Sequence, residues 1–439
     1  MAGSYKQYQG YISSGVDWIG EVPSHWSVKR LKHIFDIKKR IAGRLGFDVL
    51  SITQRGIIVK DIESGDGQLS MDYSKYQLVF EGDFAMNHMD LLTGYVDISC
   101  FDGVTSPDYR VFTLKNYKRF NARYYLYLLQ MCYRQKIFFP LGQGSAHLGR
   151  WRLPTEAFND VVYPYPSFLE QQKIASFLDH EIAKIDTLIA KQEKLIELLQ
   201  EKRQAVISHV VTKGLNPDVP MKDSGVEWLG KVPEHWGVTR AKFVSDIFVP
   251  QRNKPELNSD NIGISWATMD DMKSDFISST QYSVSKKAFE SAASKVLPKD
   301  SVIASCVGNF GIASINKIDV IINQQLQAYI PSGISPLYLR ELISVSKCYF
   351  ELVGTAATLV YVNQQGFENL PITLPSTEEQ QGITNYLTVQ KGKLDKLIDR
   401  CFNLIELFRE RKTALISAAV TGKIDVRDWV IPDEAQREP

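Results

Sequence analysis

The chain has 439 residues, a formal net charge of +1 and a hydrophobic content of 44%. These values are those of a globular protein with enough apolar residues for two cores, and they exclude a uniformly basic protein. No apolar run reaches the roughly 18 residues that a membrane helix needs, and the polar first ten residues do not resemble a signal peptide. The five cysteines are scattered, so we expect reduced core residues, no metal site and a cytoplasmic protein.

One segment occurs twice, 210 residues apart. Residues 15–26 read Gly-Val-Asp-Trp-Ile-Gly-Glu-Val-Pro-Ser-His-Trp, and residues 225–236 read Gly-Val-Glu-Trp-Leu-Gly-Lys-Val-Pro-Glu-His-Trp. Because tryptophan and histidine are rare, chance does not explain this match. The chain is therefore a duplicated unit, with two similar halves. We interpret the Trp18 and Trp228 segments as hydrophobic clasps that tie each half to the base of a long helix.

Positive charge is concentrated in two segments of the first half. Residues 29–44 contain seven basic residues against the single acid Asp36, and residues 115–136 contain six basic residues and no acid. Tyrosines are interleaved with the second segment. Such patches suit a phosphate backbone. A solvated helix face above core tyrosines explains the second segment equally well.

Regions 20–168 and 230–375 have mixed character. Short β-branched runs, such as residues 56–59, 76–80, 302–304 and 320–322, alternate with turn signals and predict strands. Helical stretches follow at 121–138 and 335–353. We therefore predict two α+β domains with twisted sheets and a few helices.

A long helix follows each mixed region. Apolar residues from position 178 alternate steps of four and three, which is a heptad seam, and the second copy repeats it at an offset of 209. The seam residues that we expect to form a spacer and to dock partners are Leu178, Ile185, Ile189, Ile196, Leu199, Leu387, Leu394, Ile398, Ile405 and Phe408. Gly382, Gly392 and the seam residue Lys391 predict fraying or bending at the start of the second helix.

Two such helices in a duplicated chain most simply pack on each other. An approximate two-fold axis between the halves would make them antiparallel. A helix of about 40 residues spans about 60 Å, which suits a spacer better than an ordinary domain helix. The alternative is a pair of amphipathic helices, each lying on its own domain.

Several further motifs accompany the repeat. Glu170-Gln171-Gln172 and Glu379-Gln380-Gln381 open the long helices shortly after a proline, and residues 72–76, 82–83, 102–109, 323–325 and 354–357 carry polar turns. With the twin tryptophan segments and the repeat order, these features resemble the DNA-specificity subunit of type I restriction–modification systems. The resemblance covers essentially the whole chain.

The resemblance implies two target-recognition domains, each reading one half of a split, asymmetric double-stranded DNA target. The antiparallel helices would set the gap between the half-sites and dock two methyltransferase subunits; a restriction or translocase subunit is left open as a further partner. Adenine methylation and ATP-dependent cleavage would belong to the partners, with S-adenosylmethionine, ATP and Mg²⁺ bound there. No cofactor of its own and no membrane are expected for this chain.

The implied segments are a first recognition domain (1–168), a first spacer helix (169–215), a second recognition domain (216–376), a second spacer helix (377–425) and a tail (426–439). No catalytic motif is evident in any of them. A phosphate-binding Gly-x4-Gly-Lys-Ser/Thr loop is missing from the sequence, and Asn216-Pro217-Asp218 lacks the aromatic residue of an adenine methyltransferase loop. We therefore expect a non-catalytic subunit.

Polar loops before the long helices are our candidates for DNA contact, because Arg and Lys pair with guanine, and Asn and Gln with adenine. The first-half candidates are Lys38, Lys39, Arg40, Asn87, His88, Ser106, Arg119, Gln143, Ser145, His147 and Arg150; the second-half candidates are Asn309, Asn323, Gln324, Thr355, Asn363 and Gln364. Gln143 and Arg150 are the preferred base contacts. The lysines, Arg40 and Arg119 would bind phosphates. For any single residue, a structural turn is the competing explanation.

Two other functions remain as alternatives. A coiled-coil scaffold without DNA readout would not need two large domains with polar loops. A self-sufficient DNA-modifying enzyme would need catalytic motifs that we do not find.

Overall fold

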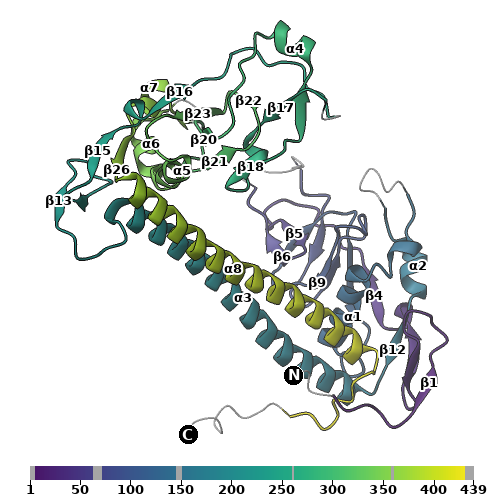
Figure 1. Ribbon diagram of the computed structural model, residues 1–439. Helices are drawn as coiled ribbons and strands as arrows, with labels where there is room; N and C mark the ends of the chain where they lie inside the picture. Colours follow the sequence, from purple (N-terminus) through teal and green to yellow (C-terminus); the bar gives the residue numbers. More distant parts are fainter. Residues whose placement is uncertain (1–4, 63–71, 145–150, 260–261, 357–359, 431–439) are drawn as a thin grey trace. The chain divides into compact units, whose positions relative to one another are not determined.

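The computed structural model describes residues 5–62, 72–144, 151–259, 262–356 and 360–430. The chain divides into two compact units: unit 1 consists of residues 1–192 and 403–439, and unit 2 of residues 193–402. Each unit contains an α+β domain and parts of both long helices, α3 (Phe168–Lys213) and α8 (Thr377–Val420) (Figure 1). The predicted α+β fold with two long helices is confirmed.

Unit 1 is built on a four-stranded antiparallel sheet of order β4-β11-β8-β9. Its elements are β1 (Tyr11–Ser13), β2 (Glu21–Pro23), β3 (Ser27–Arg30), η1 (Leu31–His33), β4 (Phe35–Lys38), β5 (Leu50–Thr53), β6 (Gly56–Val59), β7 (Gln77–Val79), β8 (Phe84–Met86), β9 (Val96–Ile98), β10 (Gly103–Thr105), β11 (Arg110–Leu114), α1 (Ala122–Arg134), η2 (Phe139–Leu141), α2 (Thr155–Asp160) and β12 (Val162–Tyr165).

Unit 2 is built on a five-stranded sheet of order β16-β23-β20-β21-β18. Its elements are β13 (Met221–Asp223), β14 (Lys231–Pro233), β15 (Gly237–Arg240), η4 (Ala241–Phe243), β16 (Ser245–Phe248), β17 (Ile264–Ala267), η5 (Met269–Asp271), β18 (Phe276–Ile277), β19 (Tyr282–Val284), α4 (Lys286–Ser291), β20 (Val302–Ser305), β21 (Ala313–Asn316), β22 (Val320–Ile322), β23 (Leu326–Pro331), α5 (Pro336–Val345), α6 (Lys347–Val353), β24 (Thr355–Ala356), β25 (Val360–Tyr361), α7 (Gln364–Glu368) and β26 (Pro371–Leu374).

The duplication extends into the two domains. The first four strands of the unit 2 sheet, β16-β23-β20-β21, have the same order and the same antiparallel pairing as β4-β11-β8-β9. The β15–β26 pair likewise matches the β3–β12 pair. Unit 2 adds β18 parallel to β21, and a separate three-stranded sheet, β19-β17-β22. The two domains therefore share a framework and differ in what is attached to it.

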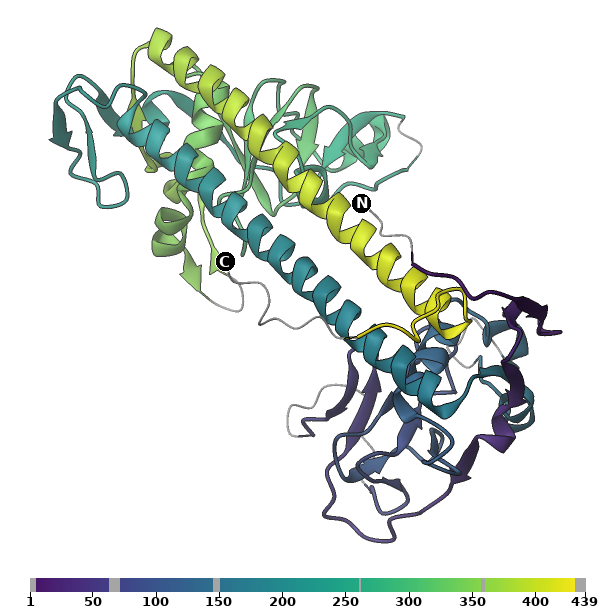
Figure 2. The ribbon, with the colours of Figure 1, turned by 90° about the horizontal axis from the view of Figure 1, so that it is seen from below.

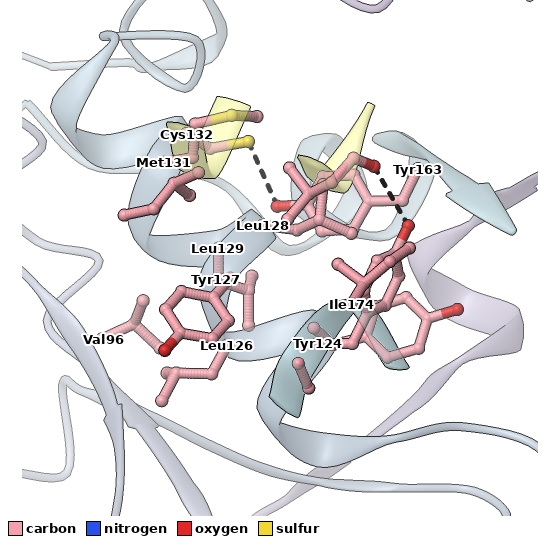
Figure 3. Packing of buried hydrophobic residues seen from close by; sticks show 14 of the residues in the cluster. Val96, Tyr124, Leu126, Tyr127, Leu128, Leu129, Met131, Cys132, Tyr163 and Ile174 are labelled. Atoms are coloured by element: carbon pink, nitrogen blue, oxygen red, sulfur yellow. Dashed lines mark hydrogen bonds between the residues drawn. The ribbon is translucent and has the colours of Figure 1, made fainter. Parts of the chain in front are cut away.

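Helix α1 is buried on nearly all sides in the core of unit 1, where Figure 3 shows it beside Ile174 of α3. Tyr124 is fully buried and donates its hydroxyl proton to the carbonyl of Val420, with an oxygen–oxygen distance of 3.1 Å. Tyr163 donates to the Cys132 sulfur at 3.3 Å. For most tyrosines of the basic segment, the core interpretation is thus the right one.

Unit 2 repeats this attachment. The hydroxyl of Tyr338, on α5, donates to the carbonyl of Val211 at 3.0 Å. Val211 lies near the end of α3, as Val420 lies at the end of α8. In each unit the first large helix of the domain is therefore bonded to the end of a long helix.

Helices α3 and α8 lie side by side and run in opposite directions within each unit (Figure 2). In unit 1, Lys412 Nζ lies 2.7 Å from a carboxylate oxygen of Asp186, and in unit 2, Arg203 Nε lies 3.2 Å from Asp395. The two ion pairs occupy equivalent positions of the repeat, because the offset of 209 aligns Asp186 with Asp395 and Arg203 with Lys412. Within each unit, the helices have the antiparallel arrangement that the duplication predicts.

Lys391 does not weaken the second helix, contrary to our expectation, and α8 continues through Gly382 and Gly392. Its ammonium group is buried and lies 2.8 Å from Glu341 of α5, and it also pairs with Asp275. Arg340 completes the cluster. Breaking such a buried network is costly, so this lysine fixes how the domain of unit 2 attaches to α8.

A glutamate carboxylate joins the repeated tryptophan segment to each long helix. Glu170, in the first turn of α3, accepts hydrogen bonds from Trp26 Nε1 at 3.0 Å and Tyr8 at 3.2 Å, and contacts His25 Nε2 at 3.0 Å. Glu379 of α8 receives the same bonds from His235 and Trp236. Trp18 itself is half-buried against Tyr163. The segment is the clasp that the sequence suggested, and Trp26 and Trp236 make the bonds.

Removing this carboxylate should destabilise unit 1 more than unit 2. The side chain of Glu170 is 7% exposed and that of Glu379 is 37% exposed. Glu170→Ala leaves the buried donors of Trp26 and Tyr8 without an acceptor. We therefore expect a loss of about 1–3 kcal/mol in the free energy of unfolding. Glu379→Ala should cost less, because water can replace the carboxylate. Urea unfolding of both variants checks this, and equal losses would contradict it.

Candidate nucleic-acid interface

The polar candidates of the second half meet at one edge of the unit 2 sheet. Strands β16 and β20 end at this edge, and β21 and β23 begin there. Cys306 N donates to the carbonyl of Gln325 at 2.9 Å, which joins the loops that carry Asn309 and Asn323. Gln324 Nε2 reaches the carbonyl of Arg252 at 3.2 Å. Three loops far apart in the sequence therefore form one surface.

The segment before α8 joins the same edge. Gly308 N donates to the carbonyl of Val360 at 2.8 Å, and Val362 N donates to that of Cys306 at 2.9 Å. These bonds attach the β24–β25 hairpin to the loop after β20. The structure therefore brings together all six second-half candidates: Asn309, Asn323, Gln324, Thr355, Asn363 and Gln364.

Some of these side chains also hold the local backbone. The Asn363 carboxamide accepts from Gly366 N at 3.0 Å and caps α7, and Asn323 accepts from Gln325 N at 3.1 Å. Gln364 bonds Glu368 at 2.7 Å, and Thr355 bonds the Tyr361 carbonyl at 3.3 Å. Asn309 is exposed at the turn after β20. The competing explanation of structural turns therefore applies to Asn323 and Asn363.

Most first-half candidates gather at the equivalent edge of unit 1. Lys38, Lys39 and Arg40 lie where β4 ends, Asn87 and His88 follow β8, and Ser106 precedes β11. Gln143 is exposed and pairs with Arg152 through two backbone hydrogen bonds. Leu153 N then donates to the carbonyl of His88 at 2.9 Å, which brings the Gln143 segment to the end of β8.

His88 is not a cationic partner for phosphate. Burial, helped by the charge of nearby Arg110, lowers the pKa of its imidazole to about 3. Arg110 is itself buried, bonds the carbonyl of Leu153 at 3.0 Å, and packs on the Phe158 ring at 4.6 Å. Burial lowers the pKa of Arg110 to about 10, so it stays charged at neutral pH. His88 and Arg110 both bond Leu153, so together they hold the loop that contains Leu153 against the end of β8.

Two of the predicted phosphate ligands do not fit with the others. Arg40 forms an ion pair with the buried carboxylate of Asp83 and stacks over Phe80, so its charge is already neutralised. Arg119 is exposed, but it follows β11 and so lies at the opposite edge of the sheet, where its carbonyl bonds Gln171. Lys39 is exposed at the candidate edge. Ser145, His147 and Arg150 lie outside the described residues.

Sequence reasoning missed a basic segment at the unit 2 edge. Arg252, Asn253 and Lys254 are exposed and follow β16, as Lys39 follows the equivalent strand β4. Gln251 bonds Ser294 at 3.1 Å and helps to hold this segment. The shared pattern of basic residues after the first sheet strand was the signal that could have revealed it.

The predicted seam residues face the helix pair. All ten are buried or half-buried in the structure: Leu178, Ile185, Ile189, Ile196, Leu199, Leu387, Leu394, Ile398, Ile405 and Phe408. This burial agrees with a spacer. It also means that a partner would meet other residues of the same helices, so the seam is not itself a docking surface.

Among the described residues, no group of three His, Cys, Asp or Glu side chains is arranged to hold a metal ion. Within the same residues, no helix is both long and apolar enough to span a bilayer.

The sheet edges, the repeated clasps and the antiparallel helices together define a duplicated recognition protein. The model of the type I restriction modification DNA specificity domain matches the chain twice, at residues 23–198 and 233–398. The chain belongs to this family. Its role within such a system is that of the DNA-specificity subunit, which is not the catalytic one.

Known proteins agree with this assignment along most of the chain. A protein of Methanocaldococcus jannaschii that carries the name of the MjaX type I restriction enzyme specificity subunit is 23% identical, over 93% of this chain and 96% of its own length. A chain from a structure describing complex assembly and conformational transition of the type I R-M system has a TM-score of 0.70 at 16% identity, covering 92% of this chain and 99% of that one. The HsdS subunit of Thermoanaerobacter tengcongensis has a TM-score of 0.51 at 15% identity, covering 92% and 98%. Both structures share the fold.

His88 should make unit 1 sensitive to acid. Its pKa is lower in the folded chain than the unfolded value of about 6.5, so the unfolded chain binds more protons below that pH. The stability that His88 contributes is complete above about pH 6.5 and is lost as pH falls towards 3. From about pH 7.5 to 5.5, the wild type should lose on the order of 1 kcal/mol more than His88→Gln. Urea unfolding at both pH values measures this, and equal losses would mean that the imidazole is not shielded.

Proposed function

We propose that this chain reads a split, asymmetric target on double-stranded DNA, with one half-site for each α+β domain. The observation that carries the proposal is the convergence of polar loops at the equivalent sheet edge of both domains. Loops on a rigid scaffold are the usual carriers of recognition, and amide and cationic side chains match the donors and acceptors of base edges. A mere scaffold would not need two such edges.

The two edges differ in chemistry, so the two half-sites should differ. The unit 1 edge presents Lys39, Gln143 and Arg152 as exposed side chains. The unit 2 edge presents mainly amides, including Asn309 and Gln324, beside the basic segment at 252–254. Amides favour adenine and cations favour guanine or phosphate, which supports an asymmetric target.

The long helices are the proposed ruler between half-sites. They contain 46 and 44 residues, which corresponds to about 65–70 Å of helix at about 1.5 Å per residue. The ion pairs between them and the buried seam make them stiff. Two recognition domains attached to such a pair would tolerate one gap length and reject others.

The same helices offer a surface for partners. Leu188, Leu195 and Leu198 of α3 are 40%, 41% and 49% exposed, although they lie outside the seam. At the offset of 209 they align with Leu397, Leu404 and Leu407 of α8, which are 42%, 39% and 57% exposed. A duplicated set of exposed leucines suits two copies of one partner.

We propose that these partners are two methyltransferase subunits, and we leave open whether a restriction or translocase subunit joins them. They would bind S-adenosylmethionine, ATP and Mg²⁺, and this chain would bind no cofactor. The complex would work in the cytoplasm, where it meets DNA.

Sequencing of methylated adenines in single DNA molecules tests the proposal. Cells that express this chain with its methyltransferase partner should show one split motif with two unlike half-sites. The motif should disappear when the chain is deleted. Normal methylation without the chain, or a continuous motif, would favour a scaffold without DNA readout. Methylation by the purified chain alone would favour a self-sufficient enzyme.

The ruler can be tested in the same assay by lengthening both helices. Repeating residues 189–195 in α3 and the paired residues 403–409 in α8 adds one heptad, or about 10 Å, to each. The gap should grow by about 3 base pairs while both half-sites stay the same. Changed half-sites with an unchanged gap would contradict the ruler.

Charge on the exposed leucines should release the partner. Leu195→Glu with Leu404→Glu changes aligned positions of the two helices and leaves the seam intact. We expect the variant to fold and to bind DNA, but to lose the methyltransferase subunit on co-purification. Leu352→Glu, on α6 and 81% exposed, is the matched control. Retention of the partner by the double variant would place docking elsewhere.

A further inference from the structure

A small cavity opens beside the candidate edge of unit 1. It has a volume of about 260 Å³, and its walls include Gln54, Gly94, Tyr95, Tyr133, Arg134 and Lys136. These residues come from the β5–β6 turn, the loop before β9 and the end of α1. Arg134 and Lys136 end the basic segment that the sequence singled out, and neither belongs to the edge described above.

The cavity is electrostatically positive. Arg134 and Lys136 supply two cations, while none of the described residues that line it is an acid. Nor does either cation form an ion pair within the described part of the chain. By contrast, Arg123 in the same basic segment is neutralised by Asp179, at 2.7 Å. Two uncompensated cations that share one concave site attract an anion.

The cavity also holds its donors in position. Arg134 Nη2 donates to the Tyr95 hydroxyl oxygen at 2.7 Å. Tyr95 is 7% exposed, and burial raises the pKa of its phenol, so the group keeps its own proton to donate. Lys136 adopts a φ of 56°, a left-handed conformation that is uncommon outside glycine. Such a conformation persists when the surroundings impose it, and functional sites often contain it.

The cavity backs directly onto the candidate recognition edge. The Tyr133 hydroxyl donates to the carbonyl of Asn87 at 2.7 Å, and Asn87 N donates to the carbonyl of Tyr95 at 2.9 Å. Asn87 follows β8 and is one of the predicted base contacts. Tyr95 and Tyr133 line the cavity and both bond Asn87, so an anion in the cavity would lie close to a predicted base contact.

We propose that this cavity binds a phosphate group of the DNA backbone that flanks the first half-site. The inference rests on the proposed DNA-reading function and adds the residues that position the duplex. Arg134 and Lys136 bind the phosphate oxygens, and the Tyr95 hydroxyl donates a further hydrogen bond. A phosphate contact of this kind fixes the register of the duplex without reading its sequence.

A neighbouring cavity shares Gln54, Tyr95 and Arg134 with the first. It is also lined by three further cations, Arg55, Arg123 and Lys412, and by two acids, Asp97 and Asp186. Arg123 is paired with Asp179 and Lys412 with Asp186, so much of its positive charge is neutralised. By contrast, none of the described residues that line the first cavity is a carboxylate.

The test is DNA binding by the full chain at several salt concentrations, with a short labelled duplex of random sequence as the probe. Arg134→Gln with Lys136→Gln should bind several-fold more weakly, and its log–log salt slope should be shallower by up to about 2. Lys118→Gln removes an exposed cation at the opposite edge of the sheet and is the matched control. Its affinity and slope should equal those of the wild type.

The outcomes separate this inference from the proposed function. A wild-type chain that binds no duplex, alone or with its methyltransferase partner, would overturn both. A double variant with wild-type affinity and slope would overturn the phosphate site alone. Inorganic phosphate provides a second arm: if it raises the Tm of the wild type but not of the variant, and the DNA slope is unchanged, the site binds free phosphate and the DNA assignment is wrong.

Discussion

The attachment of each domain to the long helices depends on one pair of adjacent side chains, a glutamate and the glutamine that follows it. Glu170 accepts hydrogen bonds from the tryptophan segment. Gln171 accepts a hydrogen bond from Asn121 N at 2.8 Å and donates one to the Pro166 carbonyl at 3.0 Å. Glu379 and Gln380 repeat both sets of bonds. Because Glu170 and both glutamines are buried, leaving them unpaired is costly, and the first turn of each helix fixes the domain beside it.

Sequence reasoning predicted the parts of this protein that periodicity and duplication control. The heptad seam predicted two long helices where α3 and α8 lie, and the duplication predicted their antiparallel pairing. The run at 56–59 is β6, and that at 320–322 is β22. The second-half candidates also proved to be neighbours, because backbone bonds of Cys306 and Gly308 join their loops at one sheet edge.

What sequence reasoning could not predict depends on tertiary partners. Lys391 looks like a flaw in the seam until Glu341 and Asp275 are brought to it by folding. Arg40 looks like a free cation until Asp83 neutralises it. His88 looks like a polar loop residue, yet burial governs its pKa. Each error has the same origin, because charge and burial are set by residues distant in the chain.

The repeated attachment has an evolutionary consequence. Tyr124 and Tyr338 bond the ends of the long helices in the same way, and the glutamate–glutamine pairs are alike, although the loops at the sheet edges differ. A recognition domain therefore carries its own connectors, and recombination within the gene could exchange one domain for another without redesigning the helices. New specificities can arise by shuffling whole modules, with the framework inherited unchanged.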